Sequence, residues 1–409
     1  MAHFELQKTK TISLDKLKKL IEIYLKPLIP MTIENKYRES TSKQQCISYN
    51  KRPDEIAVKS HFTQKEKIIL TKSPKFSSEE KKFAHDLITE LIEMHNSSRD
   101  VYRNVVFKSL HIRSIAKYIG CEKTSLLILE QFENWAARTY EGGAITSSIG
   151  IDPTSERNKV HLTEIFPYDF SAVLTNGFDT LLVVNNRGEI SGSGQLPSAQ
   201  LEIYAAPYRL NLIANWASDD RVAIVLNRLG EILIFKNSQL IFIKRSGKWQ
   251  LFAHEDCIGK LYPTIFKKKL RQSIYETCID ISFARSGGCI IIIDNKNIKE
   301  LKKLVNTNDR VDIATSNVKS QVISAMIRGT FENLDRRLRQ EFLALDGATV
   351  LDQTGKIIAV GAIISVPSGS DGGGRRAAAL KGSEFGIGIK ISEDGEIVAF
   401  KNKEIIFTA

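Results

Sequence analysis

The chain has little of what marks secreted, membrane-spanning or zinc-binding proteins. Its 409 residues include five cysteines, an odd number, and none of them lie in CxxC spacing. This pattern predicts reduced thiols in a cytoplasmic protein and argues against a disulfide framework or a zinc site. The first ten residues, MAHFELQKTK, lack the apolar stretch of a secretory signal. No apolar run approaches the roughly 20 residues that a transmembrane helix needs, so we expect no membrane partner.

Several common catalytic patterns are also absent. The sequence has no GKT or GKS of a phosphate-binding loop, and no clustered Ser, His and Asp or metal-ligand set. All seven histidines lie between His3 and His254, so the C-terminal third has none. Any chemistry in that third therefore depends on carboxylates, arginines and backbone groups.

The net charge of +11 favours a polyanionic partner, either a nucleotide or a nucleic acid. The lysines are spread along the chain and do not form one basic run. The more ordinary explanation is therefore a chain that is generally rich in lysine, and a nucleic-acid partner is the weaker alternative.

The patterns predict an α+β protein of several domains. Residues 1–150 are expected to be a mainly helical N-terminal region, 151–262 a β-rich putative sensor domain, and 263–409 a C-terminal α/β domain. We expect helices at Leu14–Leu28, Phe83–Met94 and Leu110–Ala137 in the first region. The polar segment Glu39–Ser60 is expected to be a loop, and Gly142–Pro153 a linker.

The two later regions show different patterns. Strands are predicted at Asp179–Val184 and Arg221–Leu226, each before a polar turn that contains glycine. In the last region the strand Cys289–Ile293 is predicted among helices, which are Phe266–Arg285, Asn297–Val305 and a long one at Ser316–Leu345.

One segment of the middle region recurs near the C-terminus. Gly230–Phe242 (GEILIFKNSQLIF) and Gly395–Phe407 (GEIVAFKNKEIIF) are identical at eight of thirteen positions. Two explanations remain open: two unrelated meanders, or a middle region that is a degenerate copy of the last domain's sheet. In the second case Arg209 would lie near the place of Arg375, and we expect nothing there to replace Asp346, so the copy would be non-catalytic.

The strongest candidate for chemistry is a constellation near the C-terminus. Asp346-Gly347-Ala348 begins a predicted strand, and Ser368–Gly374 (SGSDGGG) is a Gly-rich loop before the helix that opens with Arg375-Arg376. A carboxylate that can bind Mg²⁺ or Mn²⁺, next to a loop and helix N-terminus that can bind phosphate, is suited to phosphoryl or nucleotidyl transfer. The alternative is a flexible surface loop whose arginines pair with nearby acids such as Glu384.

Residues 266 to 409 resemble the diadenylate cyclase domain of the DNA-integrity-scanning type. The similar segments are Ser282–Asp294 (SFARSGGCIIIID), Arg337–Gly361 with its DGA motif, Gly373–Leu380 (GGRRAAAL) and Lys390–Ile397 (KISEDGEI). The resemblance implies a three-layer α/β domain with a mixed sheet. It also implies that ATP is converted to cyclic di-AMP across a homodimer or larger homo-oligomer, under the control of an N-terminal sensor region.

The resemblance implies a role for each matching residue. Asp346 would bind the metal and align the attacking hydroxyl, and Arg375 and Arg376 would act on the phosphates. Gly347 and Ala348 would contact nucleotide through the backbone. The remaining assignments are Gly373, Gly374 and Ser392 as substrate contacts and Glu393 as a second metal ligand.

The sequence departs from the family at one motif. The family's Arg-His-Arg triplet is Arg375-Arg376-Ala377 here. Losing one positioned donor to a transition-state phosphate typically costs roughly 10²–10³ in rate. Two functions therefore remain open: a cyclase that makes cyclic di-AMP or a related cyclic dinucleotide, and a catalytically degenerate sensor that binds ATP or a cyclic dinucleotide.

Overall fold

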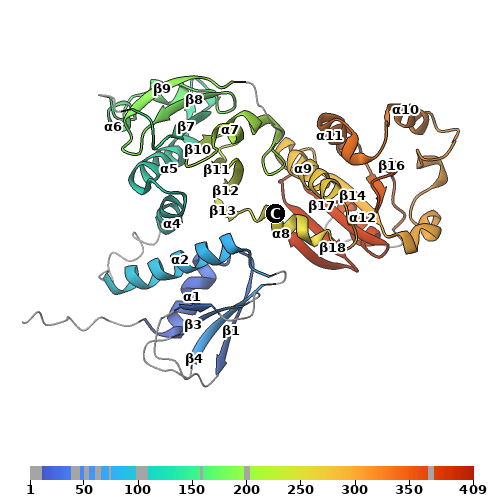
Figure 1. Ribbon diagram of the computed structural model, residues 1–409, viewed down its shortest axis with the longest axis horizontal. Helices are drawn as coiled ribbons and strands as arrows, with labels where there is room; N and C mark the ends of the chain where they lie inside the picture. The colour runs from blue at the N-terminus through green and yellow to red at the C-terminus, as the bar shows by residue number, and fades with distance from the viewer. Residues whose placement is uncertain are drawn as a thin grey trace, which may run out of the picture. The chain divides into compact units, whose positions relative to one another are not determined.

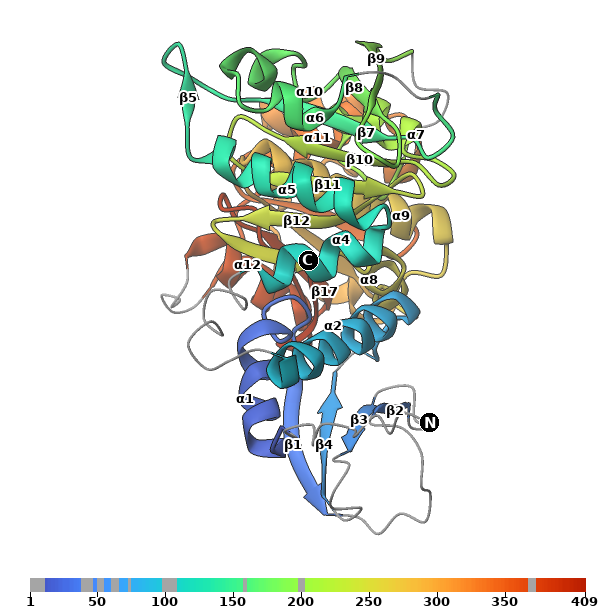
Figure 2. The same ribbon diagram turned by 90° about the vertical axis from the view of Figure 1, so that its left-hand side faces the viewer.

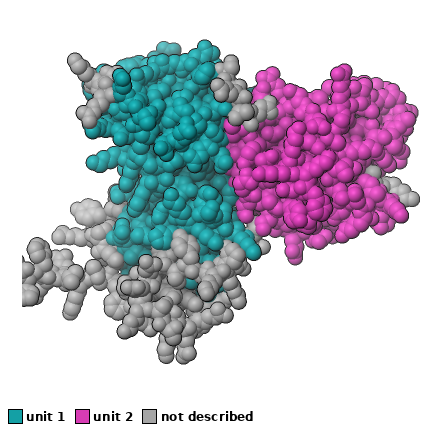
Figure 3. Space-filling model, viewed as in Figure 1, with its two compact units in different colours: residues 1–201, 209–253 teal, residues 202–208, 254–409 magenta. Residues whose placement is uncertain are grey.

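The computed structural model consists of two compact units, shown in teal and magenta in Figure 3. The first unit comprises residues 1–201 and 209–253, and the second comprises 202–208 and 254–409. The structure describes residues 12–37, 47–49, 55–59, 66–72, 75–97, 109–156, 160–197, 203–366 and 373–409. Within these ranges, no helix combines the length and apolar character that crossing a membrane requires.

The first unit begins with a sheet that the sequence analysis did not predict. Residues 1–150 were expected to be mainly helical, but four antiparallel strands pair there in the order β1-β4-β3-β2. The strands are β1 (Thr32–Tyr37), β2 (Ile47–Tyr49), β3 (Glu55–Lys59) and β4 (Glu66–Thr71). Strands β2 and β3 lie inside Glu39–Ser60, which was predicted to be a loop, and the rest of that segment lies outside the described residues.

The predicted helices of this region are present. They are α1 (Leu14–Tyr24), α2 (Ser78–Ser97), α4 (Leu110–Ile119) and α5 (Glu122–Ala136). One helix was expected at 110–137, and it is divided at Gly120 and Cys121, where both residues adopt positive φ. The apolar faces of all four helices contribute to one hydrophobic core, which also includes strands of a second, larger sheet.

This larger sheet of the first unit has seven strands in the order β13-β12-β11-β10-β7-β8-β9. Figure 2 shows α4 and α5 across one face of it. Its strands are β7 (Ser147–Ile151), β8 (Thr180–Val184), β9 (Ile190–Gln195), β10 (Val222–Leu226), β11 (Ile232–Lys236), β12 (Gln239–Arg245) and β13 (Lys248–Leu251). The connections carry the hairpin β5 (Thr139–Tyr140) and β6 (Gly143–Ala144), α6 (Leu162–Ile165), η2 (Asp169–Val173), η3 (Tyr208–Leu210) and α7 (Asn211–Trp216).

The predicted linker Gly142–Pro153 is wrong, because it contains the core strand β7. All five residues of Ser147–Ile151 are buried. The polar side chains that suggested a linker are satisfied internally: Ser148 Oγ donates to the Thr180 carbonyl, and Thr175 Oγ1 accepts from the Ser148 amide at 2.8 Å. Small hydroxyl side chains can occupy a core strand when such partners are present.

The second unit is built on a six-stranded mixed sheet in the order β16-β15-β14-β17-β18-β19 (Figure 1). The strands are β14 (Gly288–Ile293), β15 (Ala348–Asp352), β16 (Ile357–Ala362), β17 (Gly386–Ile391), β18 (Ile397–Lys401) and β19 (Glu404–Thr408). Helix α12 (Gly374–Ser383) packs on β14, β17 and β18 through Ala379 and its neighbours. The predicted mixed α/β architecture is thus present, with two large mixed sheets in the chain.

The other helices of this unit are α8 (His254–Lys260), α9 (Lys268–Ala284), η4 (Asn295–Lys303), η5 (Thr307–Asp309), α10 (Val318–Met326), η6 (Phe331–Asn333) and α11 (Arg336–Ala344). The single long helix predicted at Ser316–Leu345 is wrong. Gly329 has φ +91° and interrupts it, and Asp335 starts a new helix by accepting the amide of Arg337 at 2.8 Å.

The two large sheets share strand order, orientation and register. We call β7 to β12 the first repeat and β14 to β19 the second repeat. In each, the first two strands are parallel and every other neighbouring pair is antiparallel. Ile149 pairs with Leu182 and Ile224, as Ile290 pairs with Thr349 and Ile389. Different strand orders would have excluded an internal repeat, and the two orders agree.

Turns and irregularities recur as well. The hairpin β11–β12 shifts register at Ile234/Phe235, and β18–β19 shifts at the matching Ala399/Phe400. The second repeat has one further irregularity, between Ala348 and Val350 in its pairing with β16. The first repeat pairs regularly there, from Thr180 to Val183. The extra bulge lies at the DGA motif.

Candidate functional site

The C-terminal candidate residues gather at one edge of the six-stranded sheet. Strands β14 and β15 run parallel and both begin at this edge, and β17 runs antiparallel to β14 and ends there. The edge therefore presents Gly287 before β14, Asp346 before β15 and Ser392 after β17. Neighbouring strands lie about 4.8 Å apart, so the register places the Asp346 backbone beside that of Gly287.

Arg375 is held across this edge by the first turn of α12. Its Nη1 donates to Glu393 Oε1 at 2.8 Å, and its Nη2 donates to the Ser286 carbonyl at 3.3 Å. A Cβ on Gly287 would overlap Arg375 Nη1 and displace the guanidinium from this position, and the φ of +64° at Gly287 also favours glycine. Arg375 and Glu393 are thus brought together, and the arginine side chain remains partly accessible, at 35%.

Asp346 is exposed at the start of β15. Its Oδ1 accepts the Gly347 amide at 3.0 Å, and the other carboxylate oxygen faces no described partner. Gly347 has φ +101°, and a Cβ there would lie 2.6 Å from the Gly361 carbonyl carbon. The bulge in β16 therefore brings the backbone of Gly361 close to Gly347. This contact fixes the backbone direction at Asp346, the residue before Gly347. Ala348 is fully buried and presents only backbone at this edge.

Arg376 lies apart from Arg375. Its guanidinium carbon is 5.4 Å from the centre of the Phe400 ring, and Phe400 is buried in β18. Successive helical residues point about 100° apart, which explains why the two arginines diverge. The structure therefore brings Arg375 and Glu393 together and directs Arg376 to the sheet face at Phe400.

The remaining candidate residues lie in the flanking turns. Gly373 and Gly374 precede and begin α12, and no described atom lies within 4 Å of a Cβ added to either glycine. The Ser392 hydroxyl donates to Asp394 and to the Glu396 carbonyl within its own turn. Residues 367–372 of the predicted Gly-rich loop lie outside the described residues.

A complete metal site is not formed by side chains of the described residues. Among them, no three His, Cys, Asp or Glu side chains are grouped so as to hold a metal ion. Asp346 offers one open carboxylate, and Glu393 is engaged by Arg375. With the described side chains alone, a divalent cation at Asp346 would need further oxygen ligands, such as those of a bound phosphate.

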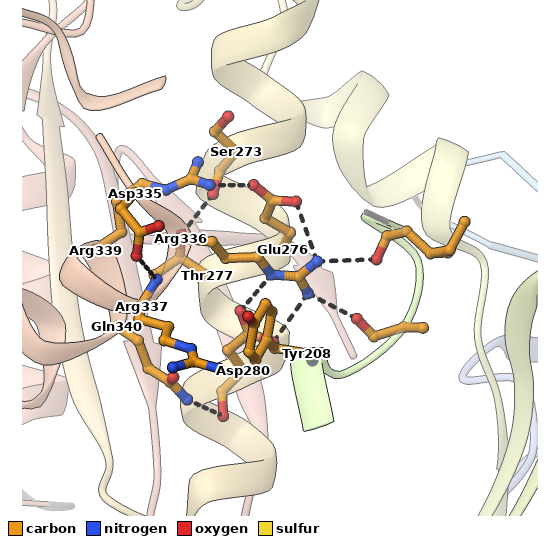
Figure 4. A network of polar contacts seen from close by, with 12 residues as sticks. Tyr208, Ser273, Glu276, Thr277, Asp280, Asp335, Arg336, Arg337, Arg339 and Gln340 are labelled. Carbon is orange, nitrogen blue, oxygen red and sulfur yellow. Dashed lines mark hydrogen bonds and ion pairs between the residues drawn. The ribbon is translucent and has the colours of Figure 1, made fainter. Parts of the chain in front are cut away.

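Helix α11, which leads into Asp346, is anchored by a buried ionic network (Figure 4). Arg336 is 2% exposed and donates to both carboxylate oxygens of Asp280, at 2.7 and 2.9 Å. It also donates to the carbonyls of Ile203 and Ala206, at 3.1 and 2.8 Å, and forms an ion pair with Glu276 at 3.5 Å. Arg339 donates to Glu276 at 2.5 Å.

This network was not predicted from the sequence. The available signal was two acids one helical turn apart on α9, Glu276 and Asp280, opposite two arginines one turn apart on α11. Nothing in the sequence indicated that the segment 203–208 completes the network. At the far end of α11, Thr349 Oγ1 donates to the Phe342 carbonyl at 3.2 Å, which ties the helix to β15 and so fixes the approach to Asp346.

Burial and charge act together on a thiol under this edge. Burial raises the pKa of Cys289 to about 12, and the positive charge of Arg375 opposes that rise. Cys289 is 1% exposed, so this thiol is a core residue of β14 and is not a nucleophile.

Comparisons with known proteins add one finding. No family model matches the chain, and no curated protein matches it. Among solved structures, DacA from Staphylococcus aureus, in the form of a double mutant, is similar to part of the chain at 18% identity. The similar region covers 34% of this chain and 85% of that one, with a TM-score of 0.21. At that TM-score the likeness carries no argument about function.

Proposed function

We propose that the second unit binds a nucleoside triphosphate such as ATP at the edge formed by Asp346, Gly287 and Arg375. The observation that carries this proposal is the guanidinium of Arg375, held across Gly287 at the first turn of a helix. A helix N-terminus and an arginine together favour a phosphate group, because backbone amides, the helix dipole and a permanent positive charge converge on it. Gly373 and Gly374 carry no side chain that would keep a phosphate away from the start of this helix.

The chemistry proposed for the site is nucleotidyl transfer of the diadenylate cyclase type. The 3′-oxygen of one ATP forms a bond to the α-phosphorus of the other, and the bond to pyrophosphate breaks. Repeating the step in the opposite direction gives cyclic di-AMP or a related cyclic dinucleotide and two pyrophosphates. The reaction needs two such domains face to face, so the proposal includes a homodimer or larger homo-oligomer. The proposal also includes regulation of this reaction by the first unit, which would act as a sensor in the cytoplasm.

Each residue has a defined task in this proposal. Asp346 aligns the attacking hydroxyl and accepts its proton, and Arg375 balances the charge that develops on the phosphate oxygens. Mg²⁺ or Mn²⁺, held by Asp346 and the phosphates, would supply additional charge stabilisation. For Glu393 to act as a metal ligand it must first release Arg375.

A second candidate is nucleotide binding without turnover, and a specific observation favours it. Arg376 stands where the family has histidine, and it packs on Phe400, away from Arg375. The group that would replace the lost imidazole is therefore absent from the phosphate side of α12, while the groups proposed to bind nucleotide remain.

Product analysis separates the two candidates. The full chain is incubated with ATP and Mn²⁺, and cyclic dinucleotide is measured by mass spectrometry. We expect product from the native chain, its loss in Asp346→Asn, and its retention in Asp179→Asn, which changes the acid at the matching position of the first repeat. Tight ATP binding without product would support the second candidate, and the absence of both binding and product would reject both.

A further inference from the structure

The first repeat has a cavity at the edge that corresponds to the candidate site of the second repeat. Its volume is about 290 Å³. The residues that line it come from the end of α5, the β5–β6 hairpin and the β10–β11 turn: Trp135, Ala136, Ala137, Arg138, Thr139, Ala144, Ile145, Arg228, Leu229 and Gly230. Strand β7 begins and β10 ends at this edge, as β14 begins and β17 ends at the other.

The common register identifies which residues correspond. Arg228 lies in the first repeat where Glu393 lies in the second, and Ile145 takes the place of Ser286. Leu210 takes the place of Arg375 and is buried. In the second repeat Arg375 reaches over this position and pairs with Glu393. Neither Leu210 nor any residue of α7 lines the cavity of the first repeat, which lies between the end of α5, the β5–β6 hairpin and the β10–β11 turn.

The charge of this position is reversed between the repeats. An acid and an arginine pair in the second repeat, whereas the first lines its cavity with Arg138 and Arg228. Arg228 forms no ion pair with any described residue, and Arg138 pairs with Asp169 at 3.0 Å, with both side chains more than half exposed. Exposed pairs of this kind contribute only about 0–1 kcal/mol, so an incoming anion can compete with Asp169 for Arg138.

The turn that carries Arg228 is rigidly built. Asn227 Oδ1 accepts the amides of Leu229 and Glu231, at 2.9 and 3.0 Å, and its Nδ2 donates to Glu231 Oε2 at 2.7 Å. Arg245 in turn donates to Glu231 at 2.6 Å. The polar neighbours of Arg228 are therefore committed to the turn, while its own guanidinium is left available.

We propose that this cavity is a second ligand site, which binds a small phosphorylated molecule of the size of a nucleoside monophosphate. The phosphate would lie at Arg228 and Arg138. The last carbonyls of α5, at Ala136 and Ala137, carry partial negative charge and suit hydroxyl or amino donors of the ligand. The volume is just below the roughly 300–1,000 Å³ typical of small-molecule pockets, so the cavity suits a mononucleotide better than a larger dinucleotide.

The proposal is tested by calorimetry on the full chain in the Arg375→Ala background, which weakens the proposed site of the second unit. The probes are AMP, sodium phosphate and adenosine. We expect AMP to bind with a single event, phosphate to bind more weakly, and adenosine not to bind. Arg228→Glu installs the acid that the second repeat has at the corresponding position, Glu393. Added to the Arg375→Ala background, it should weaken AMP binding at least tenfold.

The matched control is Arg187→Glu, because Arg187 lies in the β8–β9 turn at the opposite edge of the same sheet and undergoes the same change of charge. AMP binding should survive it. Loss of all AMP binding in Arg375→Ala alone would overturn the second site while supporting the first. Binding that Arg228→Glu leaves unchanged, or that Arg187→Glu weakens equally, would also overturn it. A third outcome separates the two proposals: AMP binding depends on Arg228 while ATP binding does not depend on Arg375. That result would support this inference and reject the proposed function.

Discussion

The two repeats share one sheet topology but differ in strand pairing and in charged side chains at the corresponding edge. In the second repeat a glycine bulge presents Asp346, and an arginine from the following helix closes the edge with Glu393. In the first repeat the strand pairs regularly at Thr180, and two arginines surround a cavity. A duplicated sheet can thus keep its register while the edge changes its chemistry through a few substitutions.

The connections before α7 and α12 differ as well. In the second repeat this connection leads through Gly373 into Arg375. In the first, residues 203–208 of the connection belong to the second unit, and Arg336 donates to the carbonyls of Ile203 and Ala206 there. The same place in the topology thus provides a proposed phosphate cradle in one repeat and an anchor in the other.

The largest expected effect comes from removing this anchor. Arg336→Met leaves Asp280 buried without its cation, which costs about 3–5 kcal/mol of unfolding free energy. Arg337→Met removes an exposed neighbour whose guanidinium carbon lies 4.9 Å from the Tyr208 ring centre, and should cost about 1 kcal/mol or less. Hydrogen exchange of the β14 and β15 amides measures both variants. Equal losses would show that the network does not stabilise the second unit.

Exchanging the residues at the bulge tests the difference in strand pairing. Gly347→Thr installs the residue of the first repeat at φ +101° against the Gly361 backbone, and strain of this kind costs roughly 1–3 kcal/mol. Thr180→Gly in the first repeat removes a hydroxyl that accepts the Asn176 amide at 2.8 Å, and costs about 1 kcal/mol. Thermal unfolding compares them. If Gly347→Thr were the milder change, the bulge would not be what distinguishes the edges.

Reversing the charge at the second edge should have a smaller effect. Glu393→Arg gives that edge the residue of the first repeat and frees Arg375 from its pair. The affinity for metal-free pyrophosphate should rise up to about fivefold, since exposed pairs are worth at most about 1 kcal/mol. Glu396→Arg changes the same charge in the same turn without touching Arg375, and serves as the control in calorimetry. A gain of equal size in both variants would mean that general charge, and not the release of Arg375, is responsible.

The reactivity of one cysteine in each unit can be compared without any mutation. Burial raises the pKa of Cys121 in the first unit and raises that of Cys289 to about 12, but only Cys121 is partly exposed. Iodoacetamide at pH 8 should therefore modify Cys121 slowly, and faster as the pH rises, because the thiolate fraction increases. Cys289 should react only after unfolding. Mass spectrometry of the native chain that finds Cys289 modified as fast as Cys121 would contradict the burial of β14.

The sequence allowed much of the second unit to be predicted and less of the first. Local pattern located α9 and the apolar strand β14, while the DGA motif and the Gly-rich loop marked the starts of β15 and α12. The strands β1 to β4 were missed because they are short and rich in charged residues. Strand β7 was missed because its serines are satisfied only by partners distant in sequence. Such long-range partners cannot be read from local pattern.

At the candidate site, one expectation of the sequence analysis was wrong. Nothing was expected to replace Asp346 in the first repeat, yet the register places Asp179 at the same position, as far ahead of Gly188 as Asp346 is of Gly355. Aligning the repeats on these turn glycines would have found it. Arg209, expected near the place of Arg375, lies in η3 directly before α7 and beside the matching Leu210.

The most direct test is a calorimetric titration of the full chain with a non-hydrolysable ATP analogue, comparing Arg375→Ala with its neighbour Arg376→Ala. Charged hydrogen bonds are worth about 1.5–3 kcal/mol, so Arg375→Ala should weaken binding by tenfold or more. Arg376→Ala should change it by no more than about threefold, because that guanidinium packs on Phe400. Equal losses in the two variants, or a native chain that does not bind the analogue, would contradict the account.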